Sequence, residues 1–242
     1  MSAASSSPRA LSLHIASAWH GRARWHFAAL ALALPLPAAG WFHSPAWADR
    51  VQVISVRGVE DVNQGEELAQ KIAKLTGVHR ARFEKVRAEL TITYADHIPD
   101  QVALDAIAAA GCQGVVGPGK GAYLPVPEYP ASADVRVVSR DGSAVGPLEK
   151  LRVSGKYTVL DFYAVWCGPC RLVDARLREL SARRRDIAVR KLNVVDFDSP
   201  LAGQLGYRLT ALPHLIVFTP SGKRIEFEGY EPDQLDAALA KK

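Results

Sequence analysis

Residues 166–170, Trp-Cys-Gly-Pro-Cys, place two cysteines three positions apart where a predicted strand gives way to a predicted helix. Residues 157–164 are apolar, β-branched and aromatic, as in a buried parallel strand, and residues 171–181 carry apolar side chains at helical spacing. The cysteine pair therefore begins a helix that follows a buried strand. Two thiols in this position can close into a reversible disulfide, which predicts thiol–disulfide exchange.

The two cysteines have unequal places on the predicted helix. A helix N-terminus presents unpaired N–H groups and a partial positive charge, which favour the thiolate, the nucleophilic form of cysteine. Cys167 lies at the start of the helix, and we expect its sulfur to be reachable from solvent, whereas Cys170 lies one turn inside and is shielded. We predict that Cys167 attacks the substrate and that Cys170 resolves the mixed disulfide, in a cycle that runs in either direction.

A cysteine pair at this spacing is also half of a zinc site, which needs four ligands. The only other cysteine of the 242 residues is Cys112, so one chain cannot assemble a four-thiolate site, and His214 is the only histidine in the C-terminal third. We therefore predict redox chemistry with no metal and no cofactor. The alternative is a metal-binding or metallochaperone protein that uses Cys167 and Cys170 as soft-metal ligands.

From residue 134 to residue 242 the chain resembles thioredoxin. Residues 158–170, Thr-Val-Leu-Asp-Phe-Tyr-Ala-Val-Trp-Cys-Gly-Pro-Cys, match the central strand and active site of that family almost residue for residue. The resemblance implies an α/β thioredoxin fold, a mixed sheet flanked by helices. It also implies an enzyme that reduces protein disulfides, because Gly168-Pro169 is the inner dipeptide of the reducing members.

The same resemblance gives two charged residues a role in proton transfer. It implies that Asp161 is a buried carboxylate that takes up and returns protons behind the cysteines, and that Lys191, on the next strand, is its partner. Burying an unpaired carboxylate costs several kcal/mol unless it takes up a proton, so a functional Asp161 is favoured over a local turn cap. For Lys191 the alternative is an ordinary surface lysine.

A further family feature falls on Pro213, in Thr-Ala-Leu-Pro-His at 210–214, where the resemblance implies a cis-proline. Only about 5–6% of X–Pro bonds in folded proteins are cis, so the sequence by itself predicts trans. The resemblance implies that Pro213 packs beside the disulfide and that Leu212 offers backbone groups to an extended substrate segment. His214 stands where the family usually has threonine, and we interpret it as solvated or hydrogen-bonded rather than as a titrating active-site group. The residues expected to contact substrate are Trp166, Gly168, Pro169, Leu212 and Pro213.

The edges of this domain follow from shorter patterns. Residues 135–138, followed by Asp141-Gly142, look like the short leading hairpin of exported thioredoxin-like proteins. Residues 220–223 predict a turn between two strands, and residues 233–240 predict a final amphipathic helix.

The N-terminus has the pattern of a secretory signal. Residues 1–26 contain three arginines and no acid, residues 27–39 are an apolar run, and Ala46-Trp47-Ala48 is a cleavage motif before Asp49. A membrane anchor typically needs about 20 apolar residues, and this run is shorter and interrupted by two prolines. We expect residues 1–48 to be a signal peptide cut after Ala48, leaving a soluble periplasmic or otherwise exported protein; a retained leader would anchor the chain in the membrane.

Removing residues 1–48 takes away three of the 30 basic residues and none of the 25 acidic ones, so the formal net charge falls from +5 to +2. A chain so close to neutral gives no reason to expect a nucleic-acid partner. The expected partners are protein substrates with disulfides or dithiols and a redox protein in the membrane or the exported compartment.

Residues 50–118 predict a second domain with the order βαββαβ, a ferredoxin-like arrangement. The predicted strands are 51–56, 78–83, 90–94 and 112–116, and the predicted helices are 66–75 and 99–110. This segment resembles a heavy-metal-associated domain, but Asp61 and Gln64 occupy the two cysteine positions of that family's metal loop. Soft Cu(I) needs thiolate or thioether ligands, so we carry over the fold and not the metal site. Asp61 or Asn63 is instead expected to cap a helix.

Two features remain between and beside these domains. Residues 119–133 are a Gly/Pro-rich linker, flexible in its glycine-rich first half and extended in its proline-rich second half. Cys112 lies near the end of the ferredoxin-like domain, where we interpret it as a small buried hydrophobic residue, with a redox role as the alternative. The linker would let the first domain present a partner, such as a metalloprotein whose cysteines need reduction, or would merely separate two folds.

Overall fold

A computed structural model describes residues 48–240. The predicted signal peptide lies outside the described residues except for Ala48. Residue contacts place the described residues, 48–240, in one unit. Among the helices of residues 48–240, none has the length and apolar character that a membrane crossing requires.

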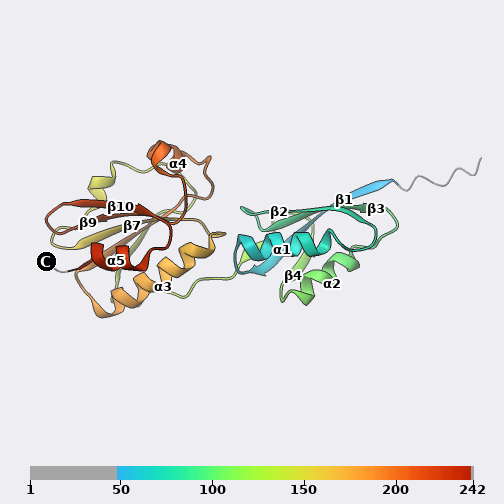
Figure 1. Cartoon of the computed structure of the whole chain (residues 1–242), viewed down its shortest axis with the longest axis horizontal. Helices are drawn as coiled ribbons and strands as arrows, with labels where there is room; N and C mark the ends of the chain where they lie inside the picture. Colours follow the sequence, from blue (N-terminus) through green and yellow to red (C-terminus); the bar gives the residue numbers. More distant parts are fainter. Residues whose placement is uncertain (1–47, 241–242) are drawn as a thin grey trace, which may run out of the picture. The chain divides into compact units, whose positions relative to one another are not determined.

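The first sheet confirms the predicted βαββαβ order. Its elements are β1 (Asp49–Val59), α1 (Val62–Ile72), β2 (Val78–Glu84), β3 (Glu89–Ala95), α2 (Gln101–Ala109), β4 (Gln113–Val116) and β5 (Ala122–Tyr123). The strand order is β2-β3-β1-β4, with β1 antiparallel to β3 and β4. Both helices cover one face of this sheet (Figure 1). The short strand β5, in the segment predicted as a linker, pairs in parallel with β1.

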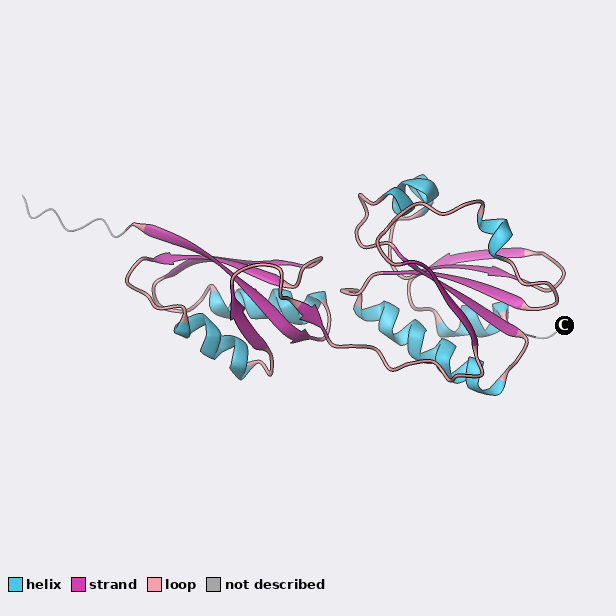
Figure 2. Cartoon of the chain, turned by 180° about the vertical axis from the view of Figure 1, so that it is seen from behind, coloured by secondary structure: helices cyan, strands magenta, loops and turns pink. Residues whose placement is uncertain are grey.

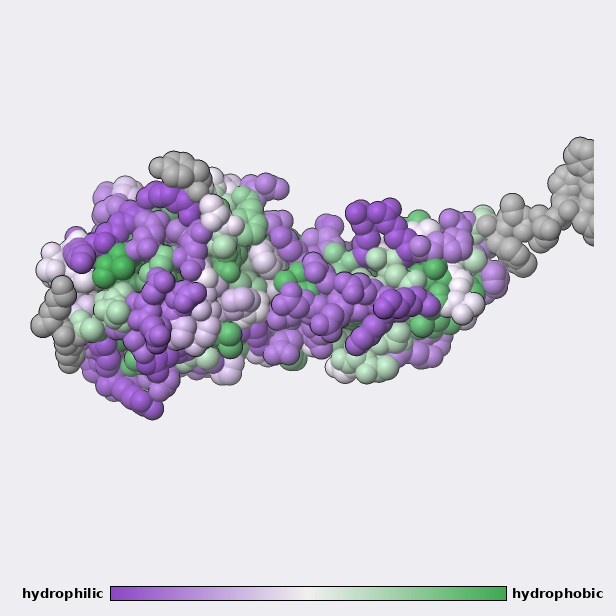
Figure 3. Space-filling view, in the orientation of Figure 1, coloured by the Kyte–Doolittle hydropathy of each residue, from purple (hydrophilic) through white to green (hydrophobic). Residues whose placement is uncertain are grey.

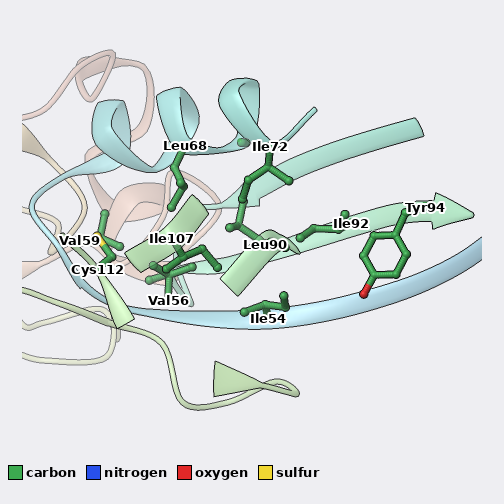
Figure 4. Close-up of a cluster of buried hydrophobic side chains, with 13 residues drawn as sticks. Ile54, Val56, Val59, Leu68, Ile72, Leu90, Ile92, Tyr94, Ile107 and Cys112 are labelled. Atoms are coloured by element: carbon green, nitrogen blue, oxygen red, sulfur yellow. The ribbon is translucent and has the colours of Figure 1, made fainter. Parts of the chain in front are cut away.

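Helix α1 begins four residues earlier than the apolar spacing predicts, because its N-cap is Asp61. The Asp61 carboxylate accepts a hydrogen bond from the Gln64 N–H at 3.0 Å, which satisfies one of the free donors at the helix start. Leu68 and Ile72 then point from α1 toward β3 (Figure 4). They pack into an apolar core whose largest members are Ile54, Leu68, Ile72, Leu90, Ile92, Tyr94 and Ile107, each at most 1% exposed.

The second sheet is mixed, with strand order β10-β9-β7-β8-β6. Its elements are β6 (Asp134–Ser139), η1 (Leu148–Leu151), β7 (Tyr157–Tyr163), α3 (Gly168–Arg183), β8 (Ile187–Asn193), α4 (Pro200–Leu205), η2 (Gly206–Arg208), β9 (His214–Phe218), β10 (Arg224–Glu228) and α5 (Pro232–Ala238). The central strand β7 runs parallel to β8 and antiparallel to β9. Helices α3 and α5 cover one face of the sheet and α4 the other (Figure 2). The thioredoxin-type fold class is therefore confirmed.

The predicted leading hairpin is wrong. Strand β6 lies at the sheet edge and pairs in parallel with β8, and no described strand follows it in a hairpin. After β6 the chain turns away because its backbone bonds to other elements. The Arg140 carbonyl accepts from the Asn193 side chain at 2.8 Å, and the Gly142 carbonyl accepts from the Leu201 N–H at 2.8 Å. The segment thus packs against α4 instead of returning as a strand.

Polar side chains cover most of the face of the molecule seen in Figure 3. Between residues 48 and 240, the large apolar residues that remain exposed are Val51, Val116, Leu124, Val126, Val165, Leu172 and Phe197.

Candidate active site

The cysteine pair lies where β7 ends and α3 begins, as predicted. Cys167 and Cys170 are joined by a disulfide, with their Cα atoms 5.3 Å apart. Cys167 is the N-cap of α3, and its sulfur accepts a hydrogen bond from the Cys170 N–H at 3.1 Å. Pro169 lies in the first turn, where backbone N–H groups have no partner within the helix, so proline costs no helical hydrogen bond there. The positive end of the helix therefore acts on the sulfur of Cys167.

The prediction that the Cys167 sulfur is reachable from solvent is wrong for this oxidised structure. Cys167 is 3% exposed, the same as Cys170. Val62, Tyr123 and Leu212 pack against the cluster that contains both cysteines. Two of these three side chains lie more than 40 positions before the motif, so the local pattern around the cysteines could not reveal the cover.

Asp161 and Lys191 lie opposite each other on β7 and β8 and form a buried ion pair. The Lys191 ammonium donates to Asp161 Oδ2 at 2.7 Å, and the aspartate is completely buried. Neither a turn cap nor a surface lysine describes these residues. The structure therefore brings together the two groups that the resemblance to thioredoxin assigns to proton transfer.

A second carboxylate, which the sequence analysis missed, completes this cluster. Asp174 of α3 accepts from the Lys191 ammonium at 2.6 Å and from the Tyr129 hydroxyl at 2.9 Å, and it is also paired with Arg178. Asp174 follows Cys170 by one helical turn on the buried side of α3. An acid on the apolar side of a helix is an unusual pattern that could have singled it out.

Burial and charge act on this cluster in opposite senses. Burial raises the pKa of Asp161, and the Lys191 ammonium opposes that shift only in part. For Lys191, burial acts to lower the pKa, but the Asp161 and Asp174 carboxylates outweigh it, so the pKa is raised. Asp161 Oδ1 is buried without a hydrogen-bond partner among the described residues. Asp161 therefore takes up a proton more readily than an exposed aspartate, while Lys191 stays charged.

A cavity of about 680 Å³ connects this cluster with the inner cysteine. Its lining includes Cys170, Lys191 and Asp174, together with Tyr129 and Arg171. The space is ample for water molecules, and these side chains offer them polar partners. Cys170, Lys191 and Asp174 therefore line one shared space.

The loop before β9 forms the other wall of the site. The Leu212–Pro213 peptide bond is cis, which confirms the conformation implied by the resemblance. Pro213 is buried, and Leu212 packs against the cysteine cluster. Glu228 of β10 holds this loop by accepting from the N–H groups of Thr210 at 2.8 Å and Ala211 at 3.3 Å.

His214 is buried and hydrogen-bonded, one of the two states in which it was interpreted. Its ring nitrogens lie 2.9 Å from Glu226 Oε1 and 3.1 Å from Glu228 Oε1. Partial burial acts to raise the pKa of Glu228, but the hydrogen bonds from Thr210 and His214 outweigh it and lower the pKa to about 2. Glu228 is the second functional candidate that the sequence analysis missed, since its role depends on contacts with a loop that precedes it by 14 to 18 positions.

The remaining candidate ligands are scattered. Within residues 48–240, no three His, Cys, Asp or Glu side chains are grouped so that they could hold a metal ion. Cys112 is buried, with its sulfur 3.7 Å from the Gly58 carbonyl oxygen, and burial raises the pKa of its thiol. It packs in the first core as a small hydrophobic residue.

Comparison with known proteins also relates the C-terminal part of the chain to thioredoxins. Residues 148–241 match the family profile described as Thioredoxin. Thioredoxin from Alicyclobacillus acidocaldarius subsp. acidocaldarius is 38% identical over 87 residues, which are 35% of this chain and 80% of that protein. Thioredoxin H8 from Arabidopsis thaliana is 33% identical over 95 residues, 39% of this chain, and the chain spans only 62% of that relative's length. Among solved structures, a copper transporter domain from yeast aligns with 28% of this chain. The alignment covers 93% of that domain, at 18% identity and a TM-score of 0.27.

Proposed function

The chain belongs to the thioredoxin family of thiol–disulfide oxidoreductases, and we propose that it is an exported member that reduces protein disulfides. One observation carries the proposal. The Cys167–Cys170 disulfide lies at the N-terminus of α3, with the Asp161–Lys191 pair behind it and the cis-Pro213 loop beside it. This arrangement supplies a nucleophile, a resolving thiol and a proton store in one place.

The catalytic cycle starts from the dithiol form. The Cys167 thiolate attacks one sulfur of a substrate disulfide, which breaks that S–S bond, forms a mixed disulfide and releases one substrate thiolate. Cys170 then loses its proton and attacks the Cys167 sulfur. The second substrate thiolate leaves, and the two electrons given to the substrate are balanced by the 167–170 disulfide, the state of this structure.

The buried charges serve the second step. Cys170 is shielded, so its proton needs an internal acceptor. Lys191 lines the same cavity as Cys170 but is already protonated, so the proton goes to a carboxylate beside it. Asp161, with its raised pKa, lies behind Lys191 and stores the proton. Lys191 keeps its charge and positions both carboxylates.

We also propose the direction of the reaction, the compartment in which it takes place and a role for the first sheet. Gly168-Pro169 between the cysteines supports the reducing direction, and the pattern of residues 1–48 supports export to the periplasm or an equivalent compartment. The first sheet would be a heavy-metal-associated-type domain that has lost its metal ligands and recruits a partner. Such a partner would be a protein whose cysteines must be reduced before they bind metal.

The test uses the chain from Asp49 onward, reduced and freed of reductant. We expect it to reduce the disulfides of insulin, Cys167→Ser to abolish that activity, and Cys170→Ser to accumulate a mixed disulfide on Cys167. Cys112→Ser is the matched control and should retain the wild-type rate. If the chain with an intact 167–170 pair reduces no disulfide, the proposal is wrong. The reduction potential of the pair tests the direction, and a value near that of strong oxidants, about −120 mV, would reverse it.

A further inference from the structure

The surface around Cys167 is occupied by another segment of the same chain. The Val62 N–H donates to the Trp166 carbonyl oxygen at 2.9 Å, and the Val62 side chain packs against the cysteine cluster. The Asp61 carboxylate lies so close to Gly168 that any side chain at position 168 would overlap it. Asp61 and Val62 are the N-cap and first residue of α1.

A second contact holds the Trp166 ring. The Lys85 ammonium lies 4.2 Å from the centre of that ring and 3.4 Å from Asp196 Oδ1. The indole N–H donates to the Val195 carbonyl at 2.7 Å. Trp166 is left only 7% exposed, so the residues flanking the reactive sulfur are covered as well as the sulfur itself.

We propose that Asp61 and Val62 occupy the surface on which protein substrates dock, as a resident occupant that a substrate must displace. An extended substrate segment needs a backbone hydrogen bond beside the reactive sulfur and an apolar contact in the adjacent groove. Val62 makes both, to the Trp166 carbonyl and to the cluster that Leu212 also contacts. With the occupant in place, only 3% of Cys167 is exposed.

The occupant also indicates the kind of partner that this surface fits. Asp61 brings a negative charge to the positive end of α3, where an anion is favoured. A fitting substrate is therefore an extended segment with an acidic residue followed by a small apolar one next to its disulfide. This inference rests on the proposed function for its consequence, because displacement matters only if Cys167 attacks a substrate.

The occupant's hydrogen bond can be removed without breaking its helix. Val62 is the first residue of α1, a position that accepts proline, and Asp61 has the extended backbone, φ −154° and ψ −176°, that a residue before proline needs. Val62→Pro thus deletes the N–H that reaches Trp166. Val62→Ala is the matched control, since it trims the side chain and keeps the N–H. Lys85→Glu removes the second contact independently.

The experiment measures how fast a bulky maleimide modifies Cys167 in the reduced chain from Asp49 onward, with Cys112→Ser as background. We expect Val62→Pro and Lys85→Glu each to raise the rate at least about threefold, with a smaller effect for Val62→Ala. For insulin reduction, the KM should fall in the same order while kcat stays constant, because an intramolecular competitor has been weakened.

Equal modification rates in the wild-type chain and in both variants, with α1 intact by circular dichroism, would overturn the inference. The modification needs no disulfide reduction. Faster modification in a protein that reduces no disulfide would therefore count against the proposed function and leave the occupied surface standing. A KM that rises in Val62→Pro would show that the contact assists substrate binding, which also contradicts displacement.

Discussion

The two sheets have five strands each but differ in what they bury. The first encloses apolar side chains almost throughout, and its buried polar residues are limited to Ser55 and Glu89 among those described. The second encloses Asp161, Asp174 and Lys191 within its interior, and His214 beside the cis-proline. Apolar burial stabilises a fold, whereas buried charges stabilise it weakly and are typical of catalysis. The difference indicates that the first sheet is built for stability and the second for chemistry.

The largest effect is expected from Lys191→Met. It leaves Asp161 and Asp174 facing each other without the shared cation, which should lower the free energy of unfolding by about 3–5 kcal/mol. Urea unfolding followed by circular dichroism measures this. Arg190→Met, on the same strand but paired with Asp134 at the sheet edge, is the control and should cost clearly less. Equal losses would remove the distinction between a central charge cluster and a peripheral ion pair.

A cavity in the core of the first sheet should lower the stability of the protein without changing its activity. Ile107 is completely buried in its core, so Ile107→Ala should lower the free energy of unfolding by about 2–5 kcal/mol. The rate of insulin reduction, measured well below the unfolding transition, should stay at the wild-type value. Val51→Ala, at a position 62% exposed, should change stability by at most about 0.5 kcal/mol. A large loss of activity in folded Ile107→Ala would contradict the division between the two sheets.

Asp161→Asn should stabilise the second sheet in a pH-dependent way. The pKa of Asp161 is raised in the folded chain, so its stability contribution is present below the ordinary value of about 3.9 and is lost as the pH rises through the folded value. Asparagine never ionises. The variant should match the wild type near pH 3 and exceed it by roughly 1–3 kcal/mol at pH 8. Insulin reduction should slow, and a stability difference independent of pH would show that proton uptake is not the cause.

The smallest effect is expected from Glu228→Gln. The pKa of Glu228 is lowered to about 2, so its contribution is present above the ordinary value of about 4.3 and is lost as the pH falls toward the folded value. Since the side chain is about a quarter exposed, we expect a loss of only about 1 kcal/mol at pH 7, shrinking toward pH 3. Glu226 contacts His214 but accepts no hydrogen bond from Thr210 or Ala211. We therefore expect Glu226→Gln to leave the KM for insulin unchanged and Glu228→Gln to raise it.

The parts of the site that follow one another in the chain were predictable. Strand 157–163, the cysteine pair and α3 follow from a pattern that changes from buried strand to helix within a few residues. Asp161 was detectable because a single acid interrupts an apolar strand. The cis bond at Pro213 needed the resemblance to thioredoxin, because the local energetics favour trans.

What escaped prediction depends on partners distant in the chain. Asp174 lies on a helix rich in charged residues. Its place on the apolar side of that helix could have singled it out, but its partners Lys191 and Tyr129 are 17 and 45 positions away. The hairpin at 135–142 was mispredicted because the bonds of its turn go to β8 and the start of α4, 50 to 60 positions away. The cover over Cys167 comes from Val62, which nothing in the motif indicates.

Trp166 has one more property that follows from its position. It is the sole tryptophan of residues 48–240, since the other four precede residue 48. Its ring lies next to the bond that opens and closes and directly under the Lys85 ammonium. A chain cut after Ala48 therefore carries a single tryptophan, and that tryptophan is at its reactive centre. We expect its emission, excited where tyrosine does not absorb, to change when the disulfide opens and when Lys85 leaves the ring.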